Sequence, residues 1–125
     1  MNAATLSIAL AVLAGILIAV QAPTNAILGK ASGSRVIAAF ISFVVGTIAL
    51  GAFVARSPGG LLTPELRSVP WYAWIGGLYG AFFVAVAAFG APRIGVGPLL
   101  TAAIAGELLA AILSDQYSVL RLTRP

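Results

Sequence analysis

The sequence contains no cysteine and no histidine, and only three of its 125 residues are acidic. Without cysteine the chain can form no disulfide and use no thiol chemistry, and without histidine it lacks a proton switch near neutral pH. Zinc sites built from these two residue types are excluded as well. Charged residues make up 8% of the chain, against about 25% in a water-soluble domain. This composition excludes a soluble enzyme, a disordered tail and a nucleic-acid-binding domain, and we expect neither a cofactor nor a metal.

Apolar residues are abundant instead: 61% of the chain is hydrophobic, and these residues gather in four runs. The runs cover about residues 3–28, 36–55, 71–89 and 97–113. A transmembrane helix needs about 20 mostly apolar residues. We therefore predict an all-α integral membrane protein, in which residues 1–125 form a single transmembrane domain of four helices. The first run is too long for the core of a signal peptide and follows no positive residue, so we expect a retained helix.

Short segments rich in glycine, proline and serine separate the runs and indicate turns. They are residues 29–35, 56–60 and 91–95. In the longest connection, Thr63 and Pro64 are typical of an N-cap and a first helical position, which predicts a short surface helix up to Val69. Aromatic residues that favour the headgroup layer follow at Trp71, Tyr72 and Trp74.

Small residues recur at helical spacing in three of the runs. Membrane helices pack through such residues because lipid gives them no hydrophobic reason to associate. The ladders are Ser7, Ala11, Gly15 and Ala19; Gly76, Gly80 and Ala88; and Ala102, Gly106, Ala110 and Ser114. We predict that Gly15, Gly76, Gly80 and Gly106 serve helix packing.

The basic residues barely favour one membrane orientation. With four spans, one side carries Arg56, Arg67, Arg121 and Arg124, and the other carries Lys30, Arg35 and Arg93. Orientation follows the Lys and Arg count of short loops, and four against three is a weak bias. We therefore expect an antiparallel dimer, either of two identical chains or with an oppositely oriented relative, because two such chains make the inverted repeat of many transporters.

Glu107 is the one ionisable residue well inside a predicted span, near the middle of the fourth run. Burial in a membrane is costly for a carboxylate, and such residues often bind protons or cations. Two interpretations remain open: Glu107 is a proton or substrate site, or it is neutral or paired and serves packing.

Four other polar residues are candidates for the same site. Gln21 and Asn25 lie four apart, hence on one helix face that must pass Pro23. They either line a cavity or form the polar end of the first helix in the headgroup layer. Ser42 either bonds back to its own helix or meets a ligand, and the Tyr79 hydroxyl is a further candidate for substrate contact. The chain has no Ser/His or Cys/His pair and no phosphate loop, so we do not expect an enzyme.

An ordered set of motifs resembles one protein family. The motifs are residues 21–26 (QAPTNA), 42–47 (SFVVGT), 70–81 (PWYAWIGGLYGA), 91–95 (APRIG), and the Ala105-Gly106-Glu107 and Ser114-Asp115 segments. They resemble the YdcZ family, a bacterial inner-membrane branch of the drug/metabolite transporter superfamily. Members usually carry Gln at the position of Glu107 and commonly continue into a fifth helix, whereas no fifth apolar run follows here. With four helices the chain is similar to small multidrug resistance proteins, which work as antiparallel dimers.

The resemblance implies a secondary-active transporter of metabolites or drug-like molecules that works by alternating access across the bacterial inner membrane. In this interpretation Glu107 binds protons or substrate, and the face of Gln21 and Asn25 completes the cavity. Two alternatives remain: a dual-topology ion channel similar to the fluoride channels, with Phe40, Phe43 and Asn25 in its filter, and a membrane assembly subunit that transports nothing. The carboxylate of Glu107 argues against an anion pore. The expected partners are lipid, a second chain and a small-molecule substrate.

Overall fold

The chain folds into helices, and the all-α prediction is confirmed. The computed structural model describes residues 2–59 and 63–117, and these contain no strand. Four helical segments are long and apolar enough to cross a membrane: α1, α2, α3 with α4, and α5. The elements are α1 (Ala3–Ser32), α2 (Arg35–Val54), the 3-10 helix η1 (Pro64–Ser68), α3 (Trp71–Trp74), α4 (Gly76–Ile94) and α5 (Val96–Tyr117).

Helix α1 is longer than the first apolar run, because it continues through Gly29 and Lys30 to Ser32. The Asn2 side chain caps its start by accepting a hydrogen bond from the Thr5 amide at 2.8 Å. It ends at Gly33, whose φ of 72° is a left-handed conformation that glycine adopts without strain. Only Gly33 and Ser34 then separate α1 from α2, so the two helices form a hairpin with a very tight turn.

Helices α4 and α5 form a second hairpin with an even shorter connection. Pro92 does not end α4, which continues to Ile94. A proline in the last turn removes one backbone hydrogen bond but leaves the rest of the helix intact. The chain reverses at Gly95, where φ is 85°, and α5 begins at the next residue. At the other end of α4, Ile75 breaks the helix, so the predicted aromatic cluster forms the separate short helix α3.

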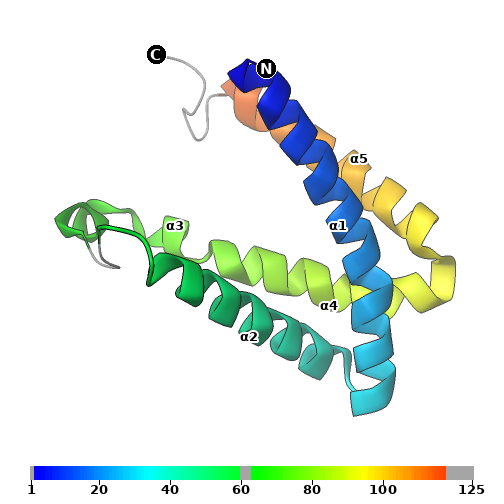
Figure 1. Ribbon diagram of the computed structural model, residues 1–125. Helices are drawn as coiled ribbons and strands as arrows, with labels where there is room; N and C mark the ends of the chain where they lie inside the picture. Colours follow the sequence, from blue (N-terminus) through cyan, green and yellow to red (C-terminus); the bar gives the residue numbers. More distant parts are fainter. Residues whose placement is uncertain (1, 60–62, 118–125) are drawn as a thin grey trace.

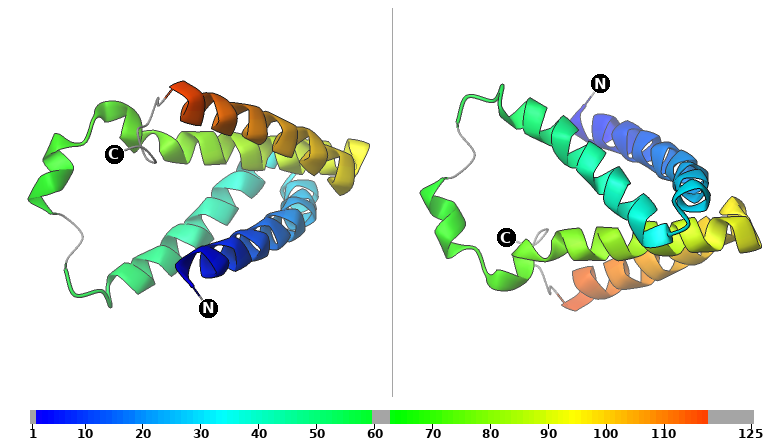
Figure 2. Two further views of the ribbon diagram at one scale, coloured as in Figure 1. Left: turned by 90° about the horizontal axis from the view of Figure 1, so that it is seen from above. Right: turned by 90° about the horizontal axis from the view of Figure 1, so that it is seen from below.

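The two hairpins lie side by side, and each of them is open (Figure 1). Helices α1 and α5 lead away from the two tight turns in one direction, and α2 and α4 lead away in another. The further views show the four helices converging at the end with the turns and diverging towards the opposite end (Figure 2). The chain is therefore packed at one end and spread at the other.

The core lies at the converging end and is built mainly from alanine. Buried residues are Ala22 on α1, Ala38 and Ala39 on α2, Val84, Ala87, Ala88 and Ala91 on α4, and Leu99 on α5. Small side chains let the backbones approach closely, which is how membrane helices associate. Small residues thus do form the contacts, although most of the contacts involve alanines outside the ladders.

The predicted packing glycines have different surroundings. A Cβ added at Gly80 would lie 3.3 Å from Cζ of Phe43, so α2 and α4 are close at this point. A Cβ at Gly15, Gly76 or Gly106 would have no atom within 4 Å apart from the nearby backbone of its own helix. The closest approach is at Gly90, where a Cβ would lie 2.8 Å from Leu99 Cδ1. Any packing role of Gly15, Gly76 and Gly106 therefore concerns a second molecule.

Large apolar side chains cover the outside of all four spans. Leu17, Phe53, Phe82 and Leu109, one from each span, are 60%, 73%, 73% and 65% exposed. In water such a surface would aggregate, whereas in a bilayer it contacts lipid tails. The chain is a multi-pass membrane protein in contact with lipid.

Candidate functional site

A side-chain hydrogen bond joins α1 and α2 in the interior of the hairpin. Nε2 of Gln21 donates to Oγ of Ser42 over 3.4 Å. The other side-chain hydrogen bonds of the described residues stay within four positions in sequence. Two of the residues predicted to form a site are therefore brought together by the fold.

These two side chains line a hollow of about 210 Å³ between the helices. The other lining residues are Phe43, Gly46, Thr47 and Leu50, all on α2. A rise of about 1.5 Å per residue places Ser42 about 10 Å and Thr47 about 18 Å from the first residue of α2. Because α2 has 20 residues, this hollow lies inside the span and away from both of its ends.

Asn25 lies one helical turn from Gln21, towards the tight turn. It is 2% exposed and is the one polar side chain buried in the described part of the chain. Helix α1 continues seven residues beyond it, so Asn25 is part of the helix body. Gln21 and Asn25 therefore do not lie at the end of the helix itself, which continues to Ser32. Whether they line a cavity or lie in the headgroup layer stays a prediction.

Glu107 is not part of this cluster in the single chain. It lies near the middle of α5, on an exposed surface. Only Leu99 of α5 is buried. No hydrogen bond of the described residues connects the Glu107 carboxylate to Gln21, Asn25 or Ser42. One chain alone therefore does not assemble the cavity that the sequence predicts.

Tyr79 also lies apart from the polar hollow. Its side chain is 65% exposed on α4, and it does not line the hollow of Gln21 and Ser42. If its hydroxyl contacts a substrate, it does so from a surface that a second molecule or lipid covers.

Phe43 separates the polar hollow from an apolar one. The second hollow has a volume of about 280 Å³ and lies between α2 and α4. It is lined by Val36, Ala39, Phe40, Phe43, Ala81 and Ala85. Phe43 belongs to both walls, and its ring lies against Gly80. The sequence offered no signal for this role, because it depends on α4 lying beside α2.

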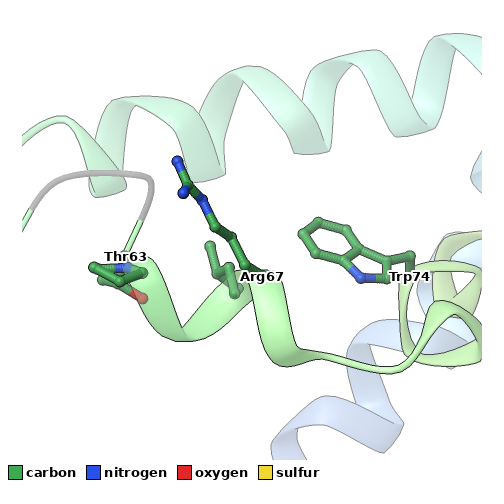
Figure 3. Close-up of a pocket in the computed structure, with 5 residues that line it drawn as sticks. Thr63, Arg67 and Trp74 are labelled. Atoms are coloured by element: carbon green, nitrogen blue, oxygen red, sulfur yellow. The ribbon is translucent and has the colours of Figure 1, made fainter.

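A further hollow of about 420 Å³ lies between η1 and α3, at the start of the third span. Thr63, Pro64, Leu66, Arg67 and Trp74 line it. Figure 3 shows Arg67 and Trp74 standing on the same side of the chain, with Thr63 at the far end of η1. Glu65 on η1 is fully exposed, and hydrogen bonds from its own backbone and from the Thr63 side chain lower its pKa. This acid therefore stays charged throughout the neutral pH range.

The candidate residues thus fall into two groups. Gln21, Asn25, Ser42 and Thr47 lie inside the α1–α2 hairpin, whereas Glu107 lies apart from them on the exposed surface of α5. Residues 6–125 match the protein family described as "Putative inner membrane exporter, YdcZ". Comparisons with curated proteins and with solved structures gave no match.

Proposed function

The chain belongs to the YdcZ family and is a multi-pass protein of the inner membrane, and on this premise we propose that it is a secondary-active transporter. It moves small molecules, metabolites or drug-like compounds, by alternating access. The working unit is an antiparallel dimer. Glu107 binds a proton or a cationic substrate, and the polar residues of the α1–α2 hairpin contact the substrate.

The position of Glu107 is the observation that carries the proposal. A carboxylate exposed near the middle of a membrane span would face lipid, which is costly for any charged group. The chain itself leaves most of α5 uncovered. A second copy that packs against α5 would remove the carboxylate from lipid and place it in a cavity between the chains. Gly106, next to Glu107, lets that copy approach closely because nothing in its own chain lies near it.

The polar hollow supports a substrate path through the hairpin. Polar side chains are rare inside membranes and face the bundle interior or a water-filled cavity. The Gln21 amide and the Ser42 and Thr47 hydroxyls both donate and accept hydrogen bonds, so they suit a polar substrate without demanding a charge. The apolar hollow beyond Phe43 suits the hydrophobic part of the same molecule. Together they fit an amphipathic small molecule.

The shape of the chain supports alternating access. The helices converge at the end with the tight turns and diverge at the other. Two such chains in opposite orientation place one converging end on each side of the membrane. Rocking one chain against the other then opens one side while the other closes, as in transporters built from inverted repeats.

Transport by purified protein in liposomes tests the proposal. A panel of metabolites and organic cations is applied with and without a pH gradient, and uptake and membrane current are recorded together. We expect saturable uptake that responds to the gradient, exchange of labelled for unlabelled substrate, and little current. A large current at high rate would identify a channel. A protein that reconstitutes in both orientations but moves no compound and carries no current would be an assembly subunit, and the proposal would be abandoned.

A further inference from the structure

The converging end of the chain places two basic residues, Lys30 and Arg35, around one hollow, and a third, Arg93, directly after the lining residue Pro92. The hollow has a volume of about 350 Å³, and Lys30 and Arg35 line it together with Ala26, Ile27, Gly29, Ala88 and Pro92. Arg93 follows Pro92 directly. The three cations come from three different helices, α1, α2 and α4, so only the folded chain brings them together.

Two of these cations share one aromatic ring. The guanidinium carbon Cζ of Arg93 lies 3.6 Å from the centroid of the Phe89 ring, and Cζ of Arg35 lies 5.5 Å from the same centroid. Arg93 also donates a hydrogen bond from Nη1 to the Phe89 carbonyl oxygen. Contacts with an aromatic face orient guanidinium groups while leaving their charge intact. The two arginines are thus both held at the Phe89 ring although both are positive.

No acidic residue of the chain belongs to this end. The three acids are Glu65, Glu107 and Asp115, which lie on η1, in the middle of α5 and near its last residue. Like charges at close range repel each other unless an anion lies between them. Arg35 is also the first residue of α2, where the helix dipole favours an anion and disfavours a cation. The lack of acidic residues and the positive end of the α2 dipole therefore both make the hollow electropositive.

We propose that this hollow binds the phosphate group of an anionic ligand, with Arg35, Arg93 and Lys30 as its recognition residues. Arginine forms paired hydrogen bonds with phosphate oxygens, and lysine contributes a point charge. Basic pockets between membrane helices bind lipid headgroups in this way. The apolar floor of Ala26, Ile27 and Ala88 fits the start of an acyl chain or the carbon skeleton of a soluble phosphate compound. This site goes beyond the transport function proposed above and does not depend on it.

The opposite end of the chain provides a matched control. Arg56 donates from Nη1 to the carbonyl of Ala52 on its own helix at 3.1 Å, and Arg67 lies on η1 beside the surface hollow. Replacing both by glutamine removes the same charge as Arg35→Gln with Arg93→Gln. The two double variants therefore separate a specific site from general attraction between a basic protein and an anion.

The test measures binding of two probes to the full chain in a neutral detergent. The first is phosphatidylglycerol, compared with phosphatidylcholine of the same acyl chains, and the second is inorganic phosphate. Bound lipid is counted by native mass spectrometry, and the thermal midpoint is recorded as either probe is titrated. A ligand that binds the folded state raises this midpoint as its concentration rises.

We expect one phosphatidylglycerol to bind to each chain. Arg35→Gln/Arg93→Gln should lower the affinity for this lipid at least about tenfold, a loss of about 1.4 kcal/mol or more in binding free energy. The affinity of Arg56→Gln/Arg67→Gln should be unchanged. If inorganic phosphate also binds, and binds more weakly only to the Arg35/Arg93 variant, the ligand is a soluble phosphate compound. If only phosphatidylglycerol binds, the ligand is a lipid headgroup. Equal loss in both double variants, or no binding of either probe to the unaltered chain, would overturn the proposal. If the Arg35/Arg93 variant does not fold, Lys30→Gln replaces it, and unchanged affinity of that variant overturns the proposal as well.

Discussion

The ring of Phe43 on α2 lies against Gly80 on α4, so that a Cβ at position 80 would sit 3.3 Å from the Phe43 Cζ atom. The same ring forms part of the polar hollow and part of the apolar hollow. The contact therefore joins the packing of two helices to the shape of the candidate site. A change at Gly80 acts on the site through this ring without touching a polar group.

Replacing Gly80 by leucine should push the Phe43 ring aside and separate α2 from α4. Overpacking of this kind costs about 1–3 kcal/mol, so the thermal midpoint in detergent should fall. Gly51→Leu on α2 is the control, because a Cβ there meets no atom within 4 Å. Equal midpoints for the two variants would show that the Phe43–Gly80 contact does not matter to the fold.

Bulky residues at Gly15 and Gly106 should disrupt assembly while leaving the single chain folded. A Cβ at either position is free of other atoms in its own chain, whereas one at Gly90 would collide with Leu99. Gly15→Leu and Gly106→Leu should therefore lower the dimer fraction in crosslinking or sedimentation, and Gly90→Leu should lower the thermal midpoint. An unchanged dimer fraction in Gly15→Leu and Gly106→Leu would contradict a dimer interface along α1 and α5.

The hydrogen bond between Gln21 and Ser42 should be measurable as a coupling energy. A cycle of Gln21→Ala, Ser42→Ala and the double variant should give about 0.6 kcal/mol, the usual size for such bonds between membrane helices. The cycle of Gln21→Ala with Thr47→Ala is the control, since both line the hollow without a hydrogen bond between them. We expect the second coupling to be near zero in unfolding experiments with mixed detergent micelles.

Glu107→Gln should abolish accumulation driven by a pH gradient while the protein still folds and dimerises. The amide keeps the shape of the side chain but cannot bind and release a proton. The matched control is Glu65→Gln. Because hydrogen bonds lower the Glu65 pKa, that acid is charged at neutral pH and loses its charge only as the pH falls below the usual range of a glutamate. Glu65→Gln should therefore leave the pH profile of transport unchanged between about pH 6 and 8. An unaltered profile in Glu107→Gln would remove Glu107 from the mechanism.

Reporter tags at either terminus should reveal both orientations, or one orientation opposite to that of a co-expressed relative. The reason is the charge count of four against three. Two lysines added to the turn around Lys30 should fix one orientation and, in a homodimer, impair transport. A single orientation of the unaltered chain together with a parallel dimer would contradict the antiparallel arrangement.

The apolar runs were sufficient to predict four membrane helices, because bilayer thickness imposes a length on every span. The ends of the helices were harder to predict. Glycine, lysine and serine at 29–32 have turn-like composition, yet the helix ends only where Gly33 takes a positive φ. Pro92 likewise has the composition of a break but costs a helix little in its last turn.

The candidate site was predictable only in its parts. Gln21 and Ser42 stand out in an apolar chain because each is polar, but their pairing depends on how α1 crosses α2. The close contact of Gly90 with Leu99 and the position of Phe43 between two hollows depend on neighbours that are distant in sequence. The pattern of small residues shows that helices pack closely, and only the fold shows which of these residues meet.

The unequal lengths of the two helices in the α1–α2 hairpin make the protein sensitive to bilayer thickness. Helix α1 has 30 residues and is about 45 Å long, whereas α2 has 20 residues and is about 30 Å long, close to the hydrocarbon thickness of a typical bilayer. Because only two residues join them, α1 must tilt steeply or project from the membrane when α2 stands upright. Longer acyl chains favour an upright α1 and a narrower hairpin, and shorter chains favour a wider one. Lipid chain length thereby changes the angle between α1 and α2 in the hairpin that contains Gln21 and Ser42.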